Sequence, residues 1–394
     1  MKITSVELIP FDQPYKGNLV FSANSVKAVG AFVLVRINTD EGYFGIGSSV
    51  GFSPSPNMNK GFSRKGCMVL LKDLSSLLIG EDPLRTGYLM DKVEQAIGGW
   101  YGENWWVLSY LDGALYDLKG KILNVPVYDL LGGKYRDRIP LEHIQSFQPT
   151  AEAQADEAKR YVDAGFKSIK LHVDAAPGMA VKRMKAVREA VGPDIPIGVD
   201  MGCNFRAHDA LRVIEAMDEY NLNFVEQALA AYDYDGMVAL RQKTRVPMVA
   251  DTSALSVNEA YNLVKLKAVD SCHALICRIG GLRRAAKWMD LMDTAFIDYQ
   301  ICHLGNSVAN AAAAHLAVTR KQNARFNDEL AIYLYLHGTT DTKSIKDDIV
   351  FEANGRIEDG YLYAPETRPG LGIELNAELL KRYQAHDMCP IVVK

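Results

Sequence analysis

Three short apolar runs, each ending in a carboxylate, lie between Ile195 and Ser253, and they constrain the fold more than any other feature of the sequence. They read PIGVD, NFVE and PMVAD and end at Asp200, Glu226 and Asp251. Each run contains valine, and a helix-length interval separates it from the next, as expected of consecutive buried parallel strands. The acids recur after 26 and 25 residues, which is about one strand, one helix and two loops. The spacing therefore predicts successive βα units.

The three acids are expected to meet at one place. Strands of a parallel barrel all point the same way, so carboxylates at equivalent strand ends converge on one mouth of the barrel. Three converging anions repel one another unless a cation lies between them, and a hard divalent cation with oxygen ligands is the simplest solution. We therefore expect Asp200, Glu226 and Asp251 to bind Mg²⁺. Asp200 or Asp251 alone could instead cap the following helix, but Glu is a poor cap, so capping does not explain all three.

The rest of the chain fits a barrel attached to a second unit. A chain of 394 residues is longer than one hydrophobic core usually supports, so we expect two domains. Residues 1–50 alternate in strand fashion, except for a loop-like stretch at residues 17–27. A second loop-like stretch covers residues 49–60, and residues 61–123 have helical periodicity. Eight apolar runs then follow, the number that a (β/α)8 barrel needs. They are Ile139 to Ser146, Ser168 to Val173, Pro196 to Asp200, Asn223 to Glu226, Pro247 to Asp251, Ala274 to Cys277, Ile297 to His303 and Ala324 to Asp328.

Composition excludes several functional classes. With 48% hydrophobic and 23% charged residues, the chain is typical of a globular protein, and its net charge of -4 gives no general attraction to nucleic acid or anionic membranes. No run reaches the roughly 20 apolar residues needed to cross a bilayer, and the N-terminus lacks the apolar core of a signal peptide. The six cysteines form no CxxC pair, which favours reduced thiols in the cytoplasm.

A longer motif identifies a family. The helical segment DGALYDLKGK, from Asp112 to Lys121, is followed by Pro126 and then by LLGG, which ends at Gly133. This pattern resembles the signature of the mandelate racemase and muconate lactonizing enzyme family of the enolase superfamily. The resemblance implies an α+β capping domain over residues 1–130, completed by residues 350–394, and a slightly irregular (β/α)8-type barrel over residues 135–349. It also implies a small-molecule carboxylate substrate and a homo-oligomer, either a dimer or an octamer.

The resemblance assigns roles at the strand ends. Asp200, Glu226 and Asp251 fall where the family keeps its Mg²⁺ ligands. On the second strand the family carries Lys-x-Lys, of which the second lysine is usually the base, whereas this chain has Lys170 and His172. Residues two apart on a strand face the same side, so both side chains are expected to face the barrel mouth. An imidazole can accept the proton, and we expect the neighbouring lysine to lower its pKa.

The later strands depart from the family pattern. Leu275 stands where the muconate lactonizing branch has a second lysine, although the following RIGG run, which begins at Arg278, is present. His303 ends the seventh strand, where the mandelate racemase branch has a catalytic histidine, so it is either catalytic or a packing residue. Asp328 and Glu329 lie near a substrate-binding carboxylate of the family, and either could face inward. The remaining candidates for substrate binding are His143, Asn204 and Arg278.

These assignments predict an enzyme that removes the proton next to a carboxylate and forms an enediolate. If His172 removes the proton and His303 protonates a departing hydroxyl, the reaction is the dehydration of a hydroxylated acid, which we favour because the sixth-strand lysine is missing. If the two bases act on opposite faces of one carbon, the reaction is the racemisation or epimerisation of a 2-hydroxy acid or an amino-acid derivative. A third possibility is a regulatory or binding protein that keeps the barrel and the metal site but has little activity.

Overall fold

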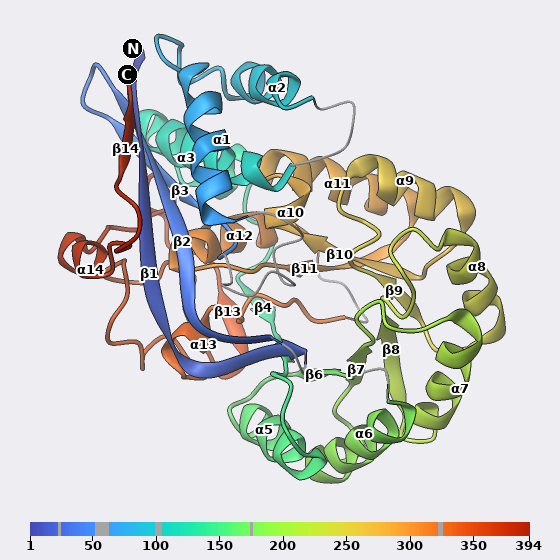
Figure 1. Cartoon of the computed structure of the whole chain (residues 1–394). Coiled ribbons are helices and arrows are strands. Elements are labelled where there is room, and N and C mark those ends of the chain that lie inside the picture. The colour runs from blue at the N-terminus through green and yellow to red at the C-terminus, as the bar shows by residue number, and fades with distance from the viewer. Residues whose placement is uncertain (23–24, 52–62, 99–104, 174–175, 322–325) are drawn as a thin grey trace.

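The structure is a computed structural model that describes residues 1–22, 25–51, 63–98, 105–173, 176–321 and 326–394. Figure 1 shows two parts: a layer of long antiparallel strands with its own helices, and a curled parallel sheet surrounded by helices. The predicted strands and helices recur in this order along the chain, with the differences given below.

The first part is a four-stranded antiparallel sheet with helices packed on it. Its strand order is β14-β1-β2-β3, so the last strand of the chain pairs with the first (Figure 1). The bounds are β1 Ile3–Ser22, β2 Ser25–Thr39, β3 Phe44–Ser48 and β14 Ile391–Val393, with the helices α1 Arg64–Ser76, α2 Thr86–Ala96, α3 Trp105–Leu123 and α4 Val127–Leu130. Alternate strand residues such as Val6 and Val35 are fully buried in an apolar core shared with these helices.

The loop predicted over residues 17–27 is wrong in the described part. Strands β1 and β2 continue through it as a hairpin, with Leu19 opposite Lys27 and Ser22 opposite Ser25. The register of the pair shifts between Pro14 and Leu19, so the paired strands absorb the irregular sequence by a local bulge. The second predicted loop, residues 49–60, lies outside the described residues from position 52 onward.

The second part is a curled sheet of parallel strands with the order β11-β10-β9-β8-β7-β6-β5. The strands are β5 Glu142–Ile144, β6 Ser168–His172, β7 Ile197–Asp200, β8 Leu222–Glu226, β9 Met248–Ala250, β10 Ser271–Leu275 and β11 Asp298–Cys302. The helices around it are α5 Ala151–Asp163, α6 Pro177–Val191, α7 Ala207–Asp218, α8 Tyr234–Lys243, α9 Val257–Leu266, α10 Ile276–Ile279, α11 Leu282–Ala295 and α12 Ser307–Ala317. One or two helices follow each strand, which confirms the predicted (β/α)8-type architecture.

The eighth position of the barrel is filled by two residues and not by a full strand. Asp328 forms a parallel bridge to Leu141, and Glu329 forms a parallel bridge to Cys302, so the segment joins the two edges of the sheet. The predicted strand began at Ala324, and residues 322–325 lie outside the described part of the chain. The helix that follows, α13 Leu334–His337, is a single turn. A remaining small sheet contains β4 Arg138–Pro140, β12 Ile357–Glu358 and β13 Tyr361–Tyr363, and α14 spans Ala377–Arg382.

The sixth strand was predicted about three residues too late. It spans Ser271–Leu275, and the apolar residues Ile276 and Cys277 begin the short helix α10. Short apolar runs fit a strand or a buried helical turn equally well. Gly280 and Gly281 follow with φ of 106° and 102°, a region that favours glycine, so the chain can end α10 and turn directly into α11.

Helix α3 connects the two parts. It lies directly on β3, because a Cβ at Gly45 would stand only 2.2 Å from the Ala114 carbonyl oxygen. Its buried Asp117 accepts hydrogen bonds from the backbone N–H groups of Ile46 and Leu371, both at 2.8 Å. The helix therefore binds the N-terminal sheet and the C-terminal segment through one carboxylate.

A second buried carboxylate of α3 binds the barrel. Asp112 Oδ2 accepts a hydrogen bond of 2.5 Å from Leu282 N and one of 3.3 Å from Arg283 N, at the start of α11. A carboxylate at this position satisfies N–H groups that have no partner within the helix. Burial nevertheless raises the pKa of Asp112 to about 7, because these N–H groups offset only part of the loss of hydration.

Replacement of Asp112 by Asn should change the pH dependence of stability. Between the ordinary carboxyl pKa of about 4 and the folded value of about 7, the folded protein keeps a proton that the unfolded chain releases. The free energy of unfolding of the wild type therefore falls as pH rises through this window, and Asp112→Asn should gain stability relative to it. Urea denaturation between about pH 5 and pH 8 measures the difference. Asp73→Asn, at an exposed position of α1, should show the pH dependence of the wild type. A difference in the free energy of unfolding between Asp112→Asn and the wild type that does not change with pH would contradict the raised pKa of Asp112.

Candidate active site

The period of two along each barrel strand decides which side chains face the interior. On β6, Ile169 and Leu171 pack into the large apolar core between strands and helices. Lys170 and His172 therefore face the other way, toward the barrel interior. On the next strand Asp200 pairs with His172 in register, and Glu226 pairs with Asp200. The predicted lysine, histidine and first two carboxylates thus meet at the carboxyl ends of neighbouring strands.

Lys170 is a buried cation between two carboxylates. Its Nζ lies 2.5 Å from Glu226 Oε2 and 2.6 Å from Glu329 Oε1, and its side chain is 3% exposed. Burial alone would lower the pKa of Lys170, but the two carboxylates hold it well above its ordinary value. An ammonium in this state holds anions in place and cannot accept a proton. Glu329, and not Asp328, is the eighth-position carboxylate that faces inward.

His172 has one nitrogen that can exchange a proton. Its Nδ1 lies 2.9 Å from the carbonyl oxygen of Gln145, which can only accept, so Nδ1 carries the hydrogen. Its Nε2 lies 3.1 Å from Asp200 Oδ2. Burial and Lys170 lower the pKa of His172, but Asp200 raises it more, and the net shift is upward. Lys170 therefore lowers the pKa of His172 as predicted, but the net shift has the opposite direction because the Asp200 carboxylate is the stronger influence.

A group suited to a divalent cation lies beside this pair. Glu226, Asp251 and His273 each offer one ligand atom, and these atoms lie within 4.8 Å of one another. Carboxylate oxygens are the donors that hard divalent ions prefer, so the group fits a cation. Asp200 is turned toward His172 and the backbone N–H of Gly202, 2.8 Å from its Oδ1. Of the three predicted ligands, the structure therefore brings Glu226 and Asp251 together and adds His273.

Sequence reasoning missed a buried polar network below these groups. His273 Nε2 lies 2.8 Å from Gln300 Oε1, and Gln300 Nε2 donates to Glu142 Oε1 at 3.1 Å. Burial raises the pKa of Glu142 to about 8, and Glu329 adds to this shift. His273 is not among the candidate residues predicted from the sequence, and the predicted sixth strand begins one residue after it, at Ala274. The period-two pattern from Leu275 back to His273 would have placed both on the inner face.

Two predicted substrate-binding residues lie elsewhere. His143 stacks on Tyr161 of α5 with ring centroids 3.3 Å apart, and its Nε2 lies 3.1 Å from Glu157 Oε1. Its ring therefore lies between the sheet and the helix layer. Asp328 accepts hydrogen bonds from Ile301 N at 2.8 Å and Arg136 Nη2 at 2.6 Å, so both of its carboxylate oxygens are used in the barrel wall.

His303 also points away from the carboxylates. Together with residues of β3, α3 and α12 it lines a cavity of about 20 Å³, and a Cβ at Gly305 would stand 2.7 Å from its Nε2. Among the described residues neither ring nitrogen has a hydrogen-bond partner, and burial lowers the pKa of His303 to about 3.

The last two predicted substrate-binding residues lie outside the barrel strands. Asn204 is exposed in the turn after β7, and Arg278 is half-buried in α10.

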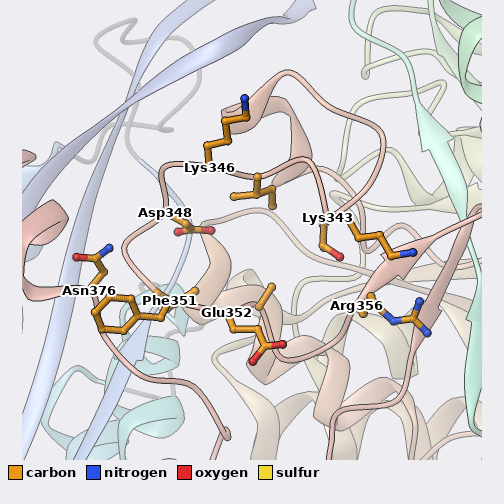
Figure 2. Close-up of a pocket in the computed structure, with 11 residues that line it drawn as sticks. Lys343, Lys346, Asp348, Phe351, Glu352, Arg356 and Asn376 are labelled. Atoms are coloured by element: carbon orange, nitrogen blue, oxygen red, sulfur yellow. The ribbon is translucent and has the colours of Figure 1, made fainter.

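A separate hollow of about 320 Å³ lies in the C-terminal segment (Figure 2). Its lining includes three cations, Lys343, Lys346 and Arg356, beside acidic residues. Lys343 and Arg356 both form ion pairs with Glu358, so they are not available to an anionic ligand without losing that partner. The hollow contains none of the strand-end groups described above.

Two family models match the chain. The model described as "Mandelate racemase / muconate lactonizing enzyme, N-terminal domain" matches residues 5–132, and the model described as "Enolase C-terminal domain-like" matches residues 153–379. Together they cover most of the sequence, including the signature helix and every strand-end group of the site except Glu142.

Curated relatives catalyse two kinds of reaction. The N-succinyl-L-Arg/Lys racemase of Bacillus cereus is 30% identical over 384 residues, which cover 97% of each chain. The D-xylonate dehydratase of Haloferax volcanii is 26% identical and covers 89% of this chain and 85% of the relative. The relatives of this chain therefore include both a racemase and a dehydratase.

Solved structures agree with the fold. A mandelate racemase/muconate lactonizing family protein from Azoarcus sp. EbN1 superimposes with a TM-score of 0.91 at 32% identity, with full coverage of both chains. A dipeptide epimerase from Enterococcus faecalis, solved with Mg and the dipeptide L-Leu-L-Tyr, gives a TM-score of 0.82 at 25% identity and covers 95% of this chain and 100% of that one. A structural neighbour with this fold thus holds Mg.

Among the described residues, none of the helices combines the length and the apolar character that crossing a bilayer requires.

Replacement of Lys170 by Met should strongly destabilise the metal-free protein. Removal of the ammonium leaves Glu226 and Glu329 buried without their cation, so the free energy of unfolding should fall by about 3–5 kcal/mol. Urea denaturation in the presence of a chelator measures this change. Lys182→Met, at an exposed position of α6, is the matched control and should change stability little. If the two variants lost equally little, Lys170 would not hold the interior together.

Proposed function

Because the chain belongs to the mandelate racemase and muconate lactonizing enzyme family, we propose that it is an enzyme that removes the proton next to the carboxylate of a small acid. The reaction that we favour is the dehydration of a hydroxylated acid, such as a sugar acid or another hydroxy acid. This activity is the one reported for a relative, the D-xylonate dehydratase.

The choice of dehydration rests on one observation, which is that the strand-end groups described above offer a single candidate base, His172. His172 Nε2 faces the carboxylates at the end of β6. The place of a second base on β10 is taken by Leu275, which is buried, and the ring of His303 packs beside Gly305. A racemase needs a proton donor on each face of the reacting carbon, whereas an elimination can use one group for both proton transfers.

The chemistry assigns a role to each nitrogen of His172. Nδ1–H stays bonded to the Gln145 carbonyl and orients the ring, while Nε2 takes the proton next to the carboxylate and an enediolate forms. The same Nε2–H then protonates the hydroxyl on the neighbouring carbon. The carbon–oxygen bond breaks and water leaves. When the α-carbon of the acid also carries a hydroxyl, the product is an enol, which rearranges to a 2-oxo acid. This replaces the role that the sequence suggested for His303.

The other groups supply charge. A divalent cation held by Asp200, Glu226 and Asp251 would stabilise the negative charge that builds up on the substrate oxygens. Lys170 keeps Glu226 and Glu329 in place and adds a fixed positive charge in the buried interior. Its proposed role is therefore electrostatic.

Racemisation or epimerisation is the second candidate. The racemase relative supports it, as does a cluster of buried apolar side chains at the strand ends, which includes Ile144, Leu275, Cys302 and Tyr335. Apolar surroundings suit an alkyl or acyl group better than a polyol. A regulatory role without catalysis is the third candidate, and exchange of the substrate proton with solvent separates it from the other two.

Incubation in D₂O tests the proposed reaction. A panel of hydroxy acids and N-acyl amino acids is mixed with the protein and a divalent cation, and proton NMR follows the loss of the α-proton signal. We expect exchange for at least one hydroxy acid, together with formation of a 2-oxo acid. His172→Gln should reduce the rate by at least about 10²-fold, as expected for loss of a general base, while bound cation is retained.

Controls separate the candidates. His208→Gln, at an exposed histidine of α7, and His303→Gln should both exchange at the wild-type rate. Exchange with inversion and without a 2-oxo acid would identify a racemase. The absence of exchange for every acid of the panel would favour the regulatory role, and wild-type exchange by His172→Gln would exclude His172 as the base.

A further inference from the structure

We infer that the acid on which the site acts carries an apolar group, such as a branched alkyl or phenyl group, beyond its reacting carbons, and that this group lies against the ends of β5, β10 and β11. The inference rests on the proposed function and narrows its substrate class. It excludes sugar acids, in which the carbons of this part of the chain carry hydroxyls.

The groups to which the proposed function assigns the chemistry stand on four neighbouring strands. Lys170 and His172 belong to β6, and Asp200 of β7 pairs in register with His172 and with Glu226 of β8. Asp251 directly follows β9. In the proposed reaction the carboxylate and the reacting carbons of the substrate therefore lie on this side of the barrel mouth.

The inner-facing side chains at the ends of β5, β10 and β11 are apolar. Leu275 and Cys302 end β10 and β11 and are paired in register, and Ile144 ends β5. All three belong to one buried apolar cluster. Their strand neighbours Ala274 and Ile301 pack instead in the core between the sheet and the helices. Because side chains alternate along a strand, the cluster faces the barrel interior.

This apolar cluster begins beside the catalytic groups. Ile144 is the register partner of Lys170. On the opposite side, Cys302 forms a parallel bridge to Glu329, whose Oε1 lies 2.6 Å from Lys170 Nζ. Neighbouring strands are about 4.8 Å apart, so a chain of about four carbons attached to the reacting carbon can extend from β6 to β5.

The outer edge of the cluster keeps apolar surface accessible. Val50, Leu255 and Leu304 pack against the cluster, and each is only half-buried. They come from three separate connections, which follow β3, β9 and β11. An apolar group of a ligand that covered these side chains would remove their surface from water, which is favourable.

A hydroxylated chain would lack hydrogen-bond partners in the cluster. Tyr335 belongs to the cluster, but its hydroxyl is used by the protein, since it donates to Glu157 Oε1 at 2.6 Å and accepts from Ser146 N at 3.0 Å. Each hydroxyl of a sugar acid that left water without a new partner would weaken binding. An alkyl group gains free energy by the same burial.

Two acids with the same carbon chain test the inference. 2,3-Dihydroxyhexanoate and hexonate share the reacting hydroxyls and differ only in the hydroxyls beyond them. All stereoisomers at the two reacting carbons are incubated with the protein and Mg²⁺ in D₂O, and proton NMR follows α-proton loss and 2-oxo acid formation. We expect kcat/KM for the best dihydroxyhexanoate to be at least about tenfold higher than for the best hexonate.

Replacement of Leu275 by Asn should change this preference. The amide removes apolar surface and offers partners to a hydroxyl, so the ratio of the two kcat/KM values should fall at least about tenfold. A loss of folded protein lowers both values alike and leaves the ratio unchanged. Leu266→Asn, at an exposed position of α9, is the matched control and should keep the wild-type ratio. If Leu275→Asn does not fold, the wild-type ratio alone decides.

The inference and the proposed function can fail separately. Equal kcat/KM values, or a preference for hexonate, would overturn the inference and leave the proposed function intact. If no acid exchanges its α-proton, the proposed function fails, and calorimetric titration then decides the inference. 2-Hydroxyhexanoate, which has no second hydroxyl to lose, should bind at least about tenfold more tightly than hexonate. Equal or weaker binding would overturn the inference.

Discussion

The ammonium group of Lys170 lies in the barrel interior, 2.5 Å from one carboxylate and 2.6 Å from another. Parallel strands necessarily bring their carboxyl ends to one mouth, so acids at these ends would repel one another in a region of low dielectric constant. Lys170 and the imidazoles of His172 and His273 lie between the acids. The site can therefore be assembled before any metal ion binds, and the positions of Glu226 and Glu329 depend on Lys170.

Much of this arrangement could be predicted from the sequence. The three acids, their spacing and the Lys170-x-His172 pair locate the carboxyl ends of β6 to β9 because buried parallel strands have short apolar runs at regular intervals. The end of β10 was less predictable. An apolar run with no polar residue at its boundary fits a strand and a helical turn equally well, and here the helical turn begins at Ile276. His273 was missed for this reason.

The other errors share a single cause. His143, His303 and Asp328 each stand one residue away from a side chain that faces the interior, namely Glu142, Cys302 and Glu329. Along a strand one step reverses the direction of the side chain, so an error of one position moves a residue from the mouth to the outer wall. Spacing alone cannot tell which of two neighbours faces inward. The hydrogen-bond partners of both residues are needed for that.

Helix α3 has a broader consequence. Its two buried aspartates bind the sheet, the C-terminal segment and α11, so the signature motif is required for the assembly of the molecule. None of its residues is among the strand-end groups Lys170, His172, Glu226, Asp251 and His273. A search with this motif therefore groups proteins by scaffold and not by reaction, and enzymes that share it can diverge in substrate while the helix stays the same.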